Sequence, residues 1–543
     1  MSRTARAQRI TALLGLAAAL ALGGCSSKSP ATDPGTVNFL IEAMPTNLDP
    51  RIGTDAYSAH LDGLIFSSLV AHDEHMEIVP DLAERWETPD ARTYVFHLHR
   101  GVKFHDGRPL TSADVKFTFD SILSGAVKTA KRGAFRLVIS VEAPDEATVI
   151  FHLREPFASF LWNLTRPGVG IVPRGSGAEI AQHPVGTGPF CFVSMRTDEE
   201  IILERNADYF GREQSGTIFA FTGQGRIYVG GNRPASVDAP LGSQVERVRF
   251  RIVPDAIVRA LELRKGSADA EINSLTPDMI ATLGKQPGLA ARDEPGTPLT
   301  YVAFNFEDPV LARREVRQAL AHATDRATII RYLLRGLARP ATSLLPPNHW
   351  AYEPDVRQYD FDPAHAELLL DAAGYHRGPD GVRLHLTLKT STDESTRLYS
   401  AVLADQWKRV GVALELKSLE FATFYSDITR GSFQLYTQRW VGGNNDPDMF
   451  EYVFSSKRLP PDGANRGHYR NAQLDALLEH ARLEVNREKR KQILSAAQKL
   501  IAEDEPYINL WYPDNVCVHR DRLTGIEIPP GGDYEFLAGA RLR

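Results

Sequence analysis

The N-terminal segment constrains this chain most, because it decides where the rest can fold. A start that carries three arginines precedes an apolar run over 10–22, which leads through two glycines to Cys25. A basic start, a short apolar stretch and small residues before a cleavage point are typical of a secretory signal. The run is shorter than the ~20 residues that a membrane-spanning helix needs. The sequence therefore predicts export and a body that folds outside the cytoplasm.

Cys25 resembles the cysteine of a bacterial lipobox, which is acylated and becomes the new N-terminus. The residues that follow it, 26–30, are polar and flexible, as a tether would be. The resemblance implies a lipoprotein signal peptide over 1–24, a tether over 25–35 and a lipid anchor at Cys25. An ordinary signal peptide with a chance cysteine is the alternative. No second long apolar segment follows, so the lipid would be the chain's only hold on the membrane.

Length and charge exclude some classes of protein. Without residues 1–24 the chain keeps 543 − 24 = 519 residues. This exceeds the ~250–300 residues at which a single core stops growing, so two or three domains are expected. Loss of the three arginines leaves 59 basic against 68 acidic residues, a net charge of −9. Nothing in this balance suggests a nucleic-acid partner.

Two further cysteines, Cys191 and Cys517, lie in apolar runs that are typical of strands. Cysteines of an exported chain can pair, but free cysteine is among the most buried residue types. Two unpaired buried thiols are therefore the favoured interpretation, and a disulfide is the alternative.

Local patterns predict an α/β globule. Alternation over 94–98, before a turn at Asp106-Gly107, is typical of a half-buried hairpin. Three helices are predicted from their caps and periodicity. The first begins at Thr111, the second runs from Asp362-Pro363 to Gly374, and the third covers 493–501 and ends before Pro506. A glycine-rich stretch with little apolar periodicity, about 211–242, predicts a surface insertion.

Catalytic and metal-binding motifs are sparse. His97 and His99 would share one face of a strand and His105 could approach them, which makes a candidate zinc site; solvent-facing histidines are the commoner case. The stretch 186–190 imitates the start of a dinucleotide-binding loop, but Cys191 stands where the third glycine would be. The sequence contains no GxSxG, HExxH or phosphate-binding loop. We therefore expect no enzyme, no cofactor and no bound metal.

Several segments, taken in order, resemble the family 5 extracellular solute-binding proteins of ABC transporters, the peptide- and nickel-binding group. Any one of them would be a weak signal, but the series spans nearly the whole mature chain. The segments are Leu-Asp-Pro at 48–50, Pro-Asp-Leu-Ala-Glu-Arg-Trp at 80–86, 101–115 around Phe-His-Asp-Gly-Arg-Pro-Leu-Thr, Pro-Val-Gly-Thr-Gly-Pro-Phe at 184–190, Arg-Gln-Ala-Leu-Ala-His-Ala-Thr-Asp-Arg at 317–326, and 362–375.

The resemblance implies a periplasmic-binding-protein-like fold of type II, the Venus flytrap, with two α/β lobes joined by a hinge. Lobe I would use 36–70, 186–298 and 508–543, and lobe II would use 299–507. An extra domain on lobe I would cover 71–185. Ligand would be enclosed between the lobes by hinge closure, and the closed form would be offered to a membrane permease.

The ligand segment departs from the family pattern. In the dipeptide- and oligopeptide-binding relatives, an aspartate three residues after a tryptophan pairs with the free amine of the peptide. Here Trp440 begins the similar segment and Gly443 stands where the aspartate would be. Asp446 or Asp448 could substitute, although Asp446 followed by proline is also a normal helix start. Trp440 offers a flat wall to a ligand, or it belongs to an ordinary core.

Three further residues are candidate ligand contacts. Asn444 lies in the same segment as Trp440. Arg466 lies in a polar, glycine-bearing stretch, and its fork could hold a ligand carboxylate bidentately; a solvated loop arginine is the alternative. Asn305 ends a stretch, 301–305, that resembles the crossing of the family into lobe II, where it could face the ligand or form an interior strand.

The expectation is a monomeric, lipid-anchored binding protein of an ABC importer, with peptides as the leading ligand class. A metal chelate or a non-peptide amine is the second candidate within that class. An exported hydrolase or metalloenzyme is the rival from another class, and it would need a nucleophile–base pair or a metal triad that the sequence lacks.

Overall fold

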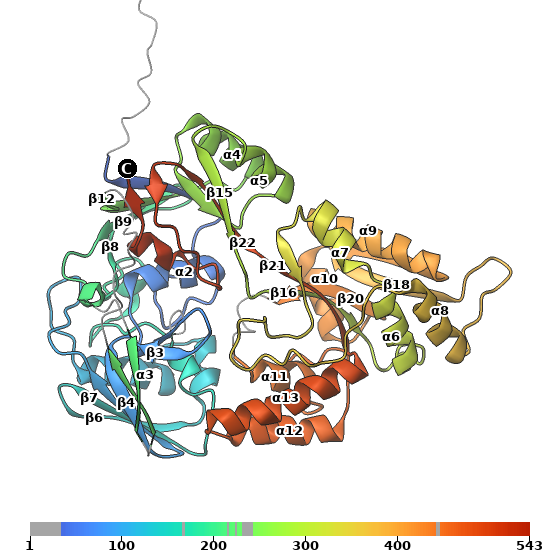
Figure 1. Ribbon diagram of the computed structural model, residues 1–543. Coiled ribbons are helices and arrows are strands. Elements are labelled where there is room, and N and C mark those ends of the chain that lie inside the picture. Colours follow the sequence, from blue (N-terminus) through green and yellow to red (C-terminus); the bar gives the residue numbers. More distant parts are fainter. Residues whose placement is uncertain (1–33, 166–168, 214–216, 223–224, 231–242, 441–445) are drawn as a thin grey trace, which may run out of the picture.

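Two mixed sheets and a smaller antiparallel sheet organise the protein (Figure 1). We call their surroundings lobe I (the seven-stranded sheet), lobe II (the six-stranded sheet) and the extra domain (the four-stranded sheet). The computed structural model describes residues 34–165, 169–213, 217–222, 225–230, 243–440 and 446–543.

The lobe I sheet has the strand order β15-β22-β14-β1-β13-β9-β8. Strand β1 is buried along its whole length and runs parallel to β13 and β14, as expected for the centre of an α/β layer. The strands are β1 Thr36–Ile41, β8 Phe190–Arg196, β9 Glu200–Arg205, β13 Arg247–Ile252, β14 Ala270–Ile272, β15 Leu289–Glu294 and β22 Asn515–Arg520; the helices are α2 Ala56–Ile65, α4 Ala256–Lys265 and α5 Pro277–Leu283; a small sheet joins β12 Ser243–Gln244, β23 Leu523–Thr524 and β24 Arg541–Leu542.

The extra domain packs the antiparallel sheet β4-β5-β7-β6 against helix α3, around one core that spans Leu69 to Ile171. Strand β5 alternates buried and half-buried residues, as expected, and pairs with β4 and β7; the turn at Gly107 comes after it. The elements are β2 Val70–His72, β3 Ile78–Pro80, β4 Ala83–Asp90, β5 Thr93–Leu98, α3 Ser112–Leu123, β6 Val138–Asp145 and β7 Thr148–Leu153.

Lobe II has the strand order β17-β21-β16-β20-β18-β19. Its central strand β16 is buried on both faces, because Val302 and Phe304 enter one core while Tyr301 and Ala303 enter another. The elements are β16 Leu299–Phe304, α6 Arg314–His322, α7 Arg326–Thr328, β17 Ala338–Pro340, α8 Pro363–Ala372, β18 Leu384–Ser391, α9 Glu394–Arg409, β19 Val412–Leu419, α10 Phe421–Thr429, β20 Leu435–Trp440, α11 Met449–Phe454, α12 Ala472–Leu483, α13 Arg487–Asp504 and β21 Tyr507–Pro513.

The chain crosses between the lobes twice. It enters lobe II between β15 and β16, and it returns between β21 and β22, at Asp514. The return therefore lies after the expected boundary at 508. Strands β21 and β22 follow each other almost without a break, so the apolar pattern of the sequence does not mark the point at which the chain changes sheets.

The predicted helices are confirmed. Thr111 is the N-cap of α3, the Asp362 side chain caps α8 before Gly374 adopts a left-handed conformation, and α13 ends before Pro506. Within the expected insertion, β10 (Thr217–Thr222) and β11 (Gly225–Gly230) form an antiparallel pair beside β3 and β4. None of the helices in the described ranges has the length and apolar character that crossing a membrane would need.

Both thiols outside the N-terminal segment are free, as favoured. Cys191 is half-buried on the edge strand β8, and Cys517 is buried on β22, with four strands of the lobe I sheet between them, so they do not meet. Cys25 and the signal and tether segments lie outside the described residues, apart from the last two positions of the tether.

Candidate functional site

An aromatic wall covers one face of the lobe II sheet. Tyr301 on β16, Tyr436 and Trp440 on β20 and Tyr507 on β21 share this face, because side chains two apart on a strand point the same way. The Tyr301 ring is stacked on Tyr507 with 4.3 Å between centroids and lies parallel to Trp440 at 6.0 Å. The Tyr436 ring stands edge-on to Tyr301, and the three tyrosines are buried, so Trp440 is the most exposed ring of the wall.

Arg466 lies against this wall with only 5% of its surface exposed. Its guanidinium carbon is 5.2 Å from the ring centroid of Trp440 and 5.3 Å from that of Tyr425, which extends from helix α10. Its Nη2 donates a hydrogen bond of 3.3 Å to the Tyr425 hydroxyl. The ring faces hold the guanidinium by cation–π attraction.

No acidic side chain within the described ranges forms an ion pair with Arg466, and its buried Nη1 has no hydrogen-bond partner there. The Tyr301 and Tyr507 hydroxyls do not supply a counter-charge. Burial raises the pKa of the Tyr301 and Tyr507 hydroxyls well above their ordinary value, so both remain neutral. A buried cation without an anion is costly, so the arrangement favours an anionic group brought by a ligand.

Two more buried polar atoms on the same face have no partner among the described residues. They are Nε1 of Trp440, a donor, and Oε1 of Gln438, an acceptor, and both belong to β20. Gln438 lies opposite Tyr301 in the sheet register. Donors from Trp440 and Arg466 beside an acceptor from Gln438 can bind a carboxylate that is next to an N–H group.

Asp446 and Asp448 lie at the start of α11 and have partners of their own. The Asp446 Oδ1 accepts the backbone N–H of Asp448 at 2.7 Å, in agreement with a role at the helix start, and it also accepts the Ser159 hydroxyl of the extra domain at 2.7 Å. Arg490 on α13 donates to Oδ1 of Asp448 at 2.7 Å. Burial, and then the neighbouring Asp448 carboxylate, raise the pKa of Asp446 to about 6.

Asn305 uses its side chain within the scaffold. Its Nδ2 donates to the carbonyl oxygens of Gly431 and Phe433, at 3.2 and 2.8 Å, and its Oδ1 accepts the backbone N–H of Glu307. It therefore fixes the turn before β20. Asn444 and Gly443 lie outside the described residues.

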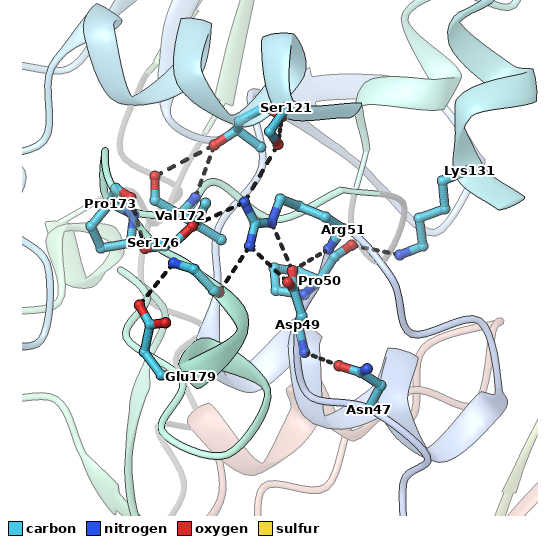
Figure 2. A network of polar contacts seen from close by, with 12 residues as sticks. Asn47, Asp49, Pro50, Arg51, Ser121, Lys131, Val172, Pro173, Ser176 and Glu179 are labelled. Atoms are coloured by element: carbon cyan, nitrogen blue, oxygen red, sulfur yellow. Dashed lines mark hydrogen bonds and ion pairs between the residues drawn. The ribbon is translucent and has the colours of Figure 1, made fainter. Parts of the chain in front are cut away.

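Another buried arginine, Arg51, marks a site of a different kind, shown in Figure 2. It belongs to the Leu-Asp-Pro segment of lobe I, and its Nε and Nη2 donate to the two carboxylate oxygens of Asp49 at 2.9 and 2.7 Å. Its remaining contacts, at 3.4 Å, go to Ser121 and to the carbonyl oxygens of Ser176 and Gly177. Every side-chain nitrogen of Arg51 therefore has a partner. Because Ser121, Ser176 and Gly177 belong to the extra domain, this cluster joins lobe I to the extra domain.

The three histidines of the candidate zinc site have separate contacts. His97 contacts Glu87 at 3.1 Å, His99 is 3.9 Å from Glu84, and His105 bonds the Gly188 carbonyl at 3.1 Å. The described part of the chain holds no group of three or more His, Cys, Asp or Glu side chains that could hold a metal ion.

The sequence pointed to Trp440 and Arg466 but not to Tyr425 or Gln438. Tyr425 is 41 positions from Arg466, and only the packing of α10 against the sheet brings them together. The alternation of Tyr436, Gln438 and Trp440 along one strand was the available signal for Gln438.

Comparison with known proteins places the chain among exported binding proteins. Residues 77–459 match the sequence model of the bacterial extracellular solute-binding proteins, family 5 (middle). The di/tripeptide-binding protein 1 of Pseudomonas aeruginosa is 27% identical over 90% of this chain and 91% of its own length. The heme-binding protein A of Haemophilus influenzae is 27% identical over 98% of this chain and 99% of its own.

The fold also matches solved structures. The periplasmic binding protein DppA from Helicobacter pylori, in complex with the peptide STSA, has a TM-score of 0.71 and 25% identity over 93% of this chain and 98% of its own. This similarity, with the sheets described above, confirms the two-lobed type II fold.

Proposed function

We propose that this protein, which belongs to the bacterial extracellular solute-binding proteins of family 5, captures peptides between its lobes and delivers them to an ABC importer. Its family and relatives are binding proteins of transport systems rather than enzymes. The similarity to di/tripeptide-binding protein 1, and to a structure that holds a peptide, supports peptides as the leading ligand class.

The observation that carries the proposal is the buried guanidinium of Arg466, which has no acidic partner among the described residues and whose Nη1 has no hydrogen-bond partner there. A peptide ends in a carboxylate, and the carboxylate of its last residue follows an amide N–H. Arg466 and the Trp440 indole N–H would donate to that carboxylate, while the Gln438 side-chain oxygen would accept the amide N–H. Trp440, the half-buried member of the aromatic wall, would lie against an apolar side chain of the peptide.

The amine end of the peptide needs separate treatment, because Gly443 replaces the aspartate that the resemblance places there. Asp446 is our first candidate for an amine contact and Asp448 our second, with Asn444 in the same segment. Asp446 and Asp448 already have partners in Ser159 and Arg490. We therefore propose that the carboxylate end contributes more to affinity than the amine end.

Ligand identity comes first among the tests. Closed binding proteins often retain ligand, so mass spectrometry of the material released by denaturing the purified protein will show what is bound. A family of short peptides supports the proposal. A metal chelate or a non-peptide amine would instead favour the second candidate, and a porphyrin would fit the similarity to heme-binding protein A.

Calorimetry with one tripeptide, its C-terminal amide and its N-acetyl form then tests the site. Loss of one partner of a buried charge pair costs roughly 2–5 kcal/mol, so we expect amidation, or Arg466→Gln, to weaken binding at least about tenfold. Arg409→Gln, which removes an exposed arginine of α9, is the control and should bind as wild type does. Equal affinity for the acid and the amide would overturn the carboxylate assignment.

The amine contact has its own variant. Asp446→Asn keeps the ability to accept the Asp448 N–H at the helix start but removes the charge. If Asp446 binds the amine, this variant and N-acetylation each weaken binding, and the effect of acetylation disappears in the variant. If neither change has an effect, Asp446 has no part in amine recognition.

The anchor is the remaining part of the proposal. We propose that Cys25 carries a lipid and holds the protein at the outer side of a membrane. Wild type should partition into the detergent phase of a cloud-point extraction, whereas Cys25→Ala should be soluble or poorly processed. Wild type recovered only from the aqueous phase would contradict the anchor and leave the ligand proposal intact.

A further inference from the structure

The extra domain touches lobe II across a polar interface that the ligand proposal does not use. The Ala158 backbone N–H donates to the Arg482 carbonyl at 3.1 Å. Glu155 pairs with the Arg482 side chain at 2.8 Å, and Glu77 pairs with Arg487. Figure 1 shows the helices that carry these arginines, α12 and α13, beside the extra domain. The interface brings together segments that are more than 300 positions apart in the chain.

A buried centre lies beside these pairs. Ser159 of the extra domain donates to Asp446 and accepts from Arg490 Nη2 at 2.9 Å. Arg490 is also held inside lobe II, by Asp448, by the Ala481 carbonyl at 3.1 Å and by the Trp350 ring at 5.9 Å. These contacts lie entirely within lobe II, so the position of Arg490 does not depend on the extra domain.

The two outer pairs are sorted by charge. The extra domain contributes the carboxylates Glu77 and Glu155, and lobe II contributes the guanidinium groups of Arg482 and Arg487, whereas Arg490 pairs with carboxylates of lobe II itself. Charge complementarity of this kind orients two surfaces that meet and part. The contact with lobe I is different, because there the buried Arg51 of lobe I donates to Ser121 and to the carbonyl oxygens of Ser176 and Gly177 of the extra domain.

The connectivity decides which contact can open. The chain links lobe I to lobe II only at the crossings beside β16 and β22, and the extra domain is joined to lobe I by the Arg51 cluster. When a hinge at the crossings opens, the extra domain moves with lobe I, and its contacts with lobe II must break.

We propose that this interface, formed by Glu77, Glu155, Ala158 and Ser159 on the extra domain and by Arg482, Arg487 and Arg490 on lobe II, is a latch that sets the balance between the open and closed forms. The proposal rests on the proposed function only in requiring that the lobes open to admit a solute. The latch needs no charged group from the ligand, so it acts on the empty protein as well. It gives the extra domain a role in closure that is separate from ligand recognition.

Hydrogen exchange of the ligand-free protein tests the latch, because opening exposes the Ala158 amide that donates to Arg482. Glu155→Arg and Arg482→Glu each place like charges face to face. We expect each to speed exchange of the 155–160 segment by about threefold to tenfold, and the double variant to restore slow exchange. Small-angle scattering should show a larger particle for each single variant and a particle of wild-type size for the double variant.

Lys457→Glu is the matched control. Lys457 pairs at 3.0 Å with Glu479, which lies on α12 as Arg482 does, and both residues belong to lobe II. It should leave exchange at 155–160 unchanged. Glu155→Gln only removes a charge from a half-exposed side chain, so it should fold even if a charge-reversal variant does not. It should also speed exchange at 155–160, but by less than the charge reversals do.

Wild-type exchange in both reversals, or a double variant that exchanges as fast as either single variant, would overturn the latch. Arg466→Gln should leave exchange at 155–160 in the empty protein unchanged. If the latch variants exchange as wild type does but Arg466→Gln still weakens binding, only the latch is overturned. If the latch variants behave as expected but Arg466→Gln binds as wild type does, only the ligand assignment is overturned.

Discussion

The extra domain is contacted by arginines of both its neighbours, but at very different burial. From lobe I, Arg51 is 2% exposed; it is paired with Asp49 of its own lobe and donates to Ser121 and to the carbonyl oxygens of Ser176 and Gly177 of the extra domain. Toward lobe II, Arg482 and Glu155 are 16% and 43% exposed. A partner removed from a buried pair leaves an uncompensated charge, whereas a pair open to water contributes about 0–1 kcal/mol. Apart from the buried contacts of Ser159 with Asp446 and Arg490, the contact with lobe II is therefore the one that we expect to open, and the Arg51 contact is the one that we expect to persist.

The largest expected effect comes from breaking the buried lobe I pair that holds Arg51 against the extra domain. Asp49→Asn leaves the Arg51 guanidinium without its carboxylate, and removal of one partner of a buried pair costs about 3–5 kcal/mol. We expect the free energy of unfolding of the unit formed by lobe I and the extra domain to fall by that amount. Urea unfolding followed by circular dichroism measures it.

Glu179→Gln is the control for this variant. Glu179 lies in the same cluster, but its carboxylate is exposed and accepts only the Gly177 N–H (Figure 2). Its substitution should cost less than about 0.5 kcal/mol. A loss below about 1 kcal/mol for Asp49→Asn would show that water reaches the Arg51 cluster, and the contrast between the two interfaces would disappear.

The sequence predicted the elements of this fold better than the contacts between them. The caps of α3 and α8 depend on residues three apart, so Thr111 and Asp362 were found from local pattern. The order of the lobes followed from the resemblance. The return of the chain from lobe II to lobe I is at Asp514, whereas the sequence predicts it at 508, because two adjacent apolar strands look like one run.

The site shows the same division. Arg466 and Trp440 are candidates because of residue type and position, but the lack of an acidic partner for Arg466 among the described residues is a property of packing. Asp446 was weighed as a helix start and as a ligand contact. Its bond to Ser159 joins residues 287 positions apart, for which a single sequence carries no signal.

A second, smaller effect concerns pH at the reversible interface. Burial and the Asp448 carboxylate raise the pKa of Asp446 to about 6, against the stabilising charge of Arg490. Opening removes the cover of the extra domain, so its pKa should return toward its ordinary value near 4. The closed form then binds the proton more tightly. Closure is favoured fully below about pH 4, and this contribution is lost as the pH rises through about 6.

The charged groups that face Asp446 are Asp448 and Arg490, and Ser159 faces it from the extra domain. Scattering of the empty protein between pH 4 and 7 should show a particle that expands as the pH rises, by at most about tenfold in the open-to-closed ratio per pH unit. Asp446→Asn should abolish this dependence and should not unfold α11. The same pH response in wild type and variant would assign the change to another group.

The smallest expected effect is the response of the latch to salt, and it separates the two interfaces without any change in the protein's sequence. Ions screen exposed charges over about 10 Å at 0.1 M and about 3 Å at 1 M, whereas buried pairs are screened much less. Between about 0.05 and 0.5 M sodium chloride, the pairs Glu155–Arg482 and Glu77–Arg487 should weaken by less than about 1 kcal/mol together, which speeds exchange at 155–160 by up to about fivefold. Exchange at Ser121 and its neighbours, which contact Arg51, should not change.

The double reversal of Glu155 and Arg482 should respond to salt as wild type does, because it preserves the attraction. Either single reversal should respond in the opposite direction, because salt relieves its repulsion. Equal acceleration at both interfaces would mean that salt acts on the whole fold, and the two contacts of the extra domain would then not differ in the way that their burial indicates.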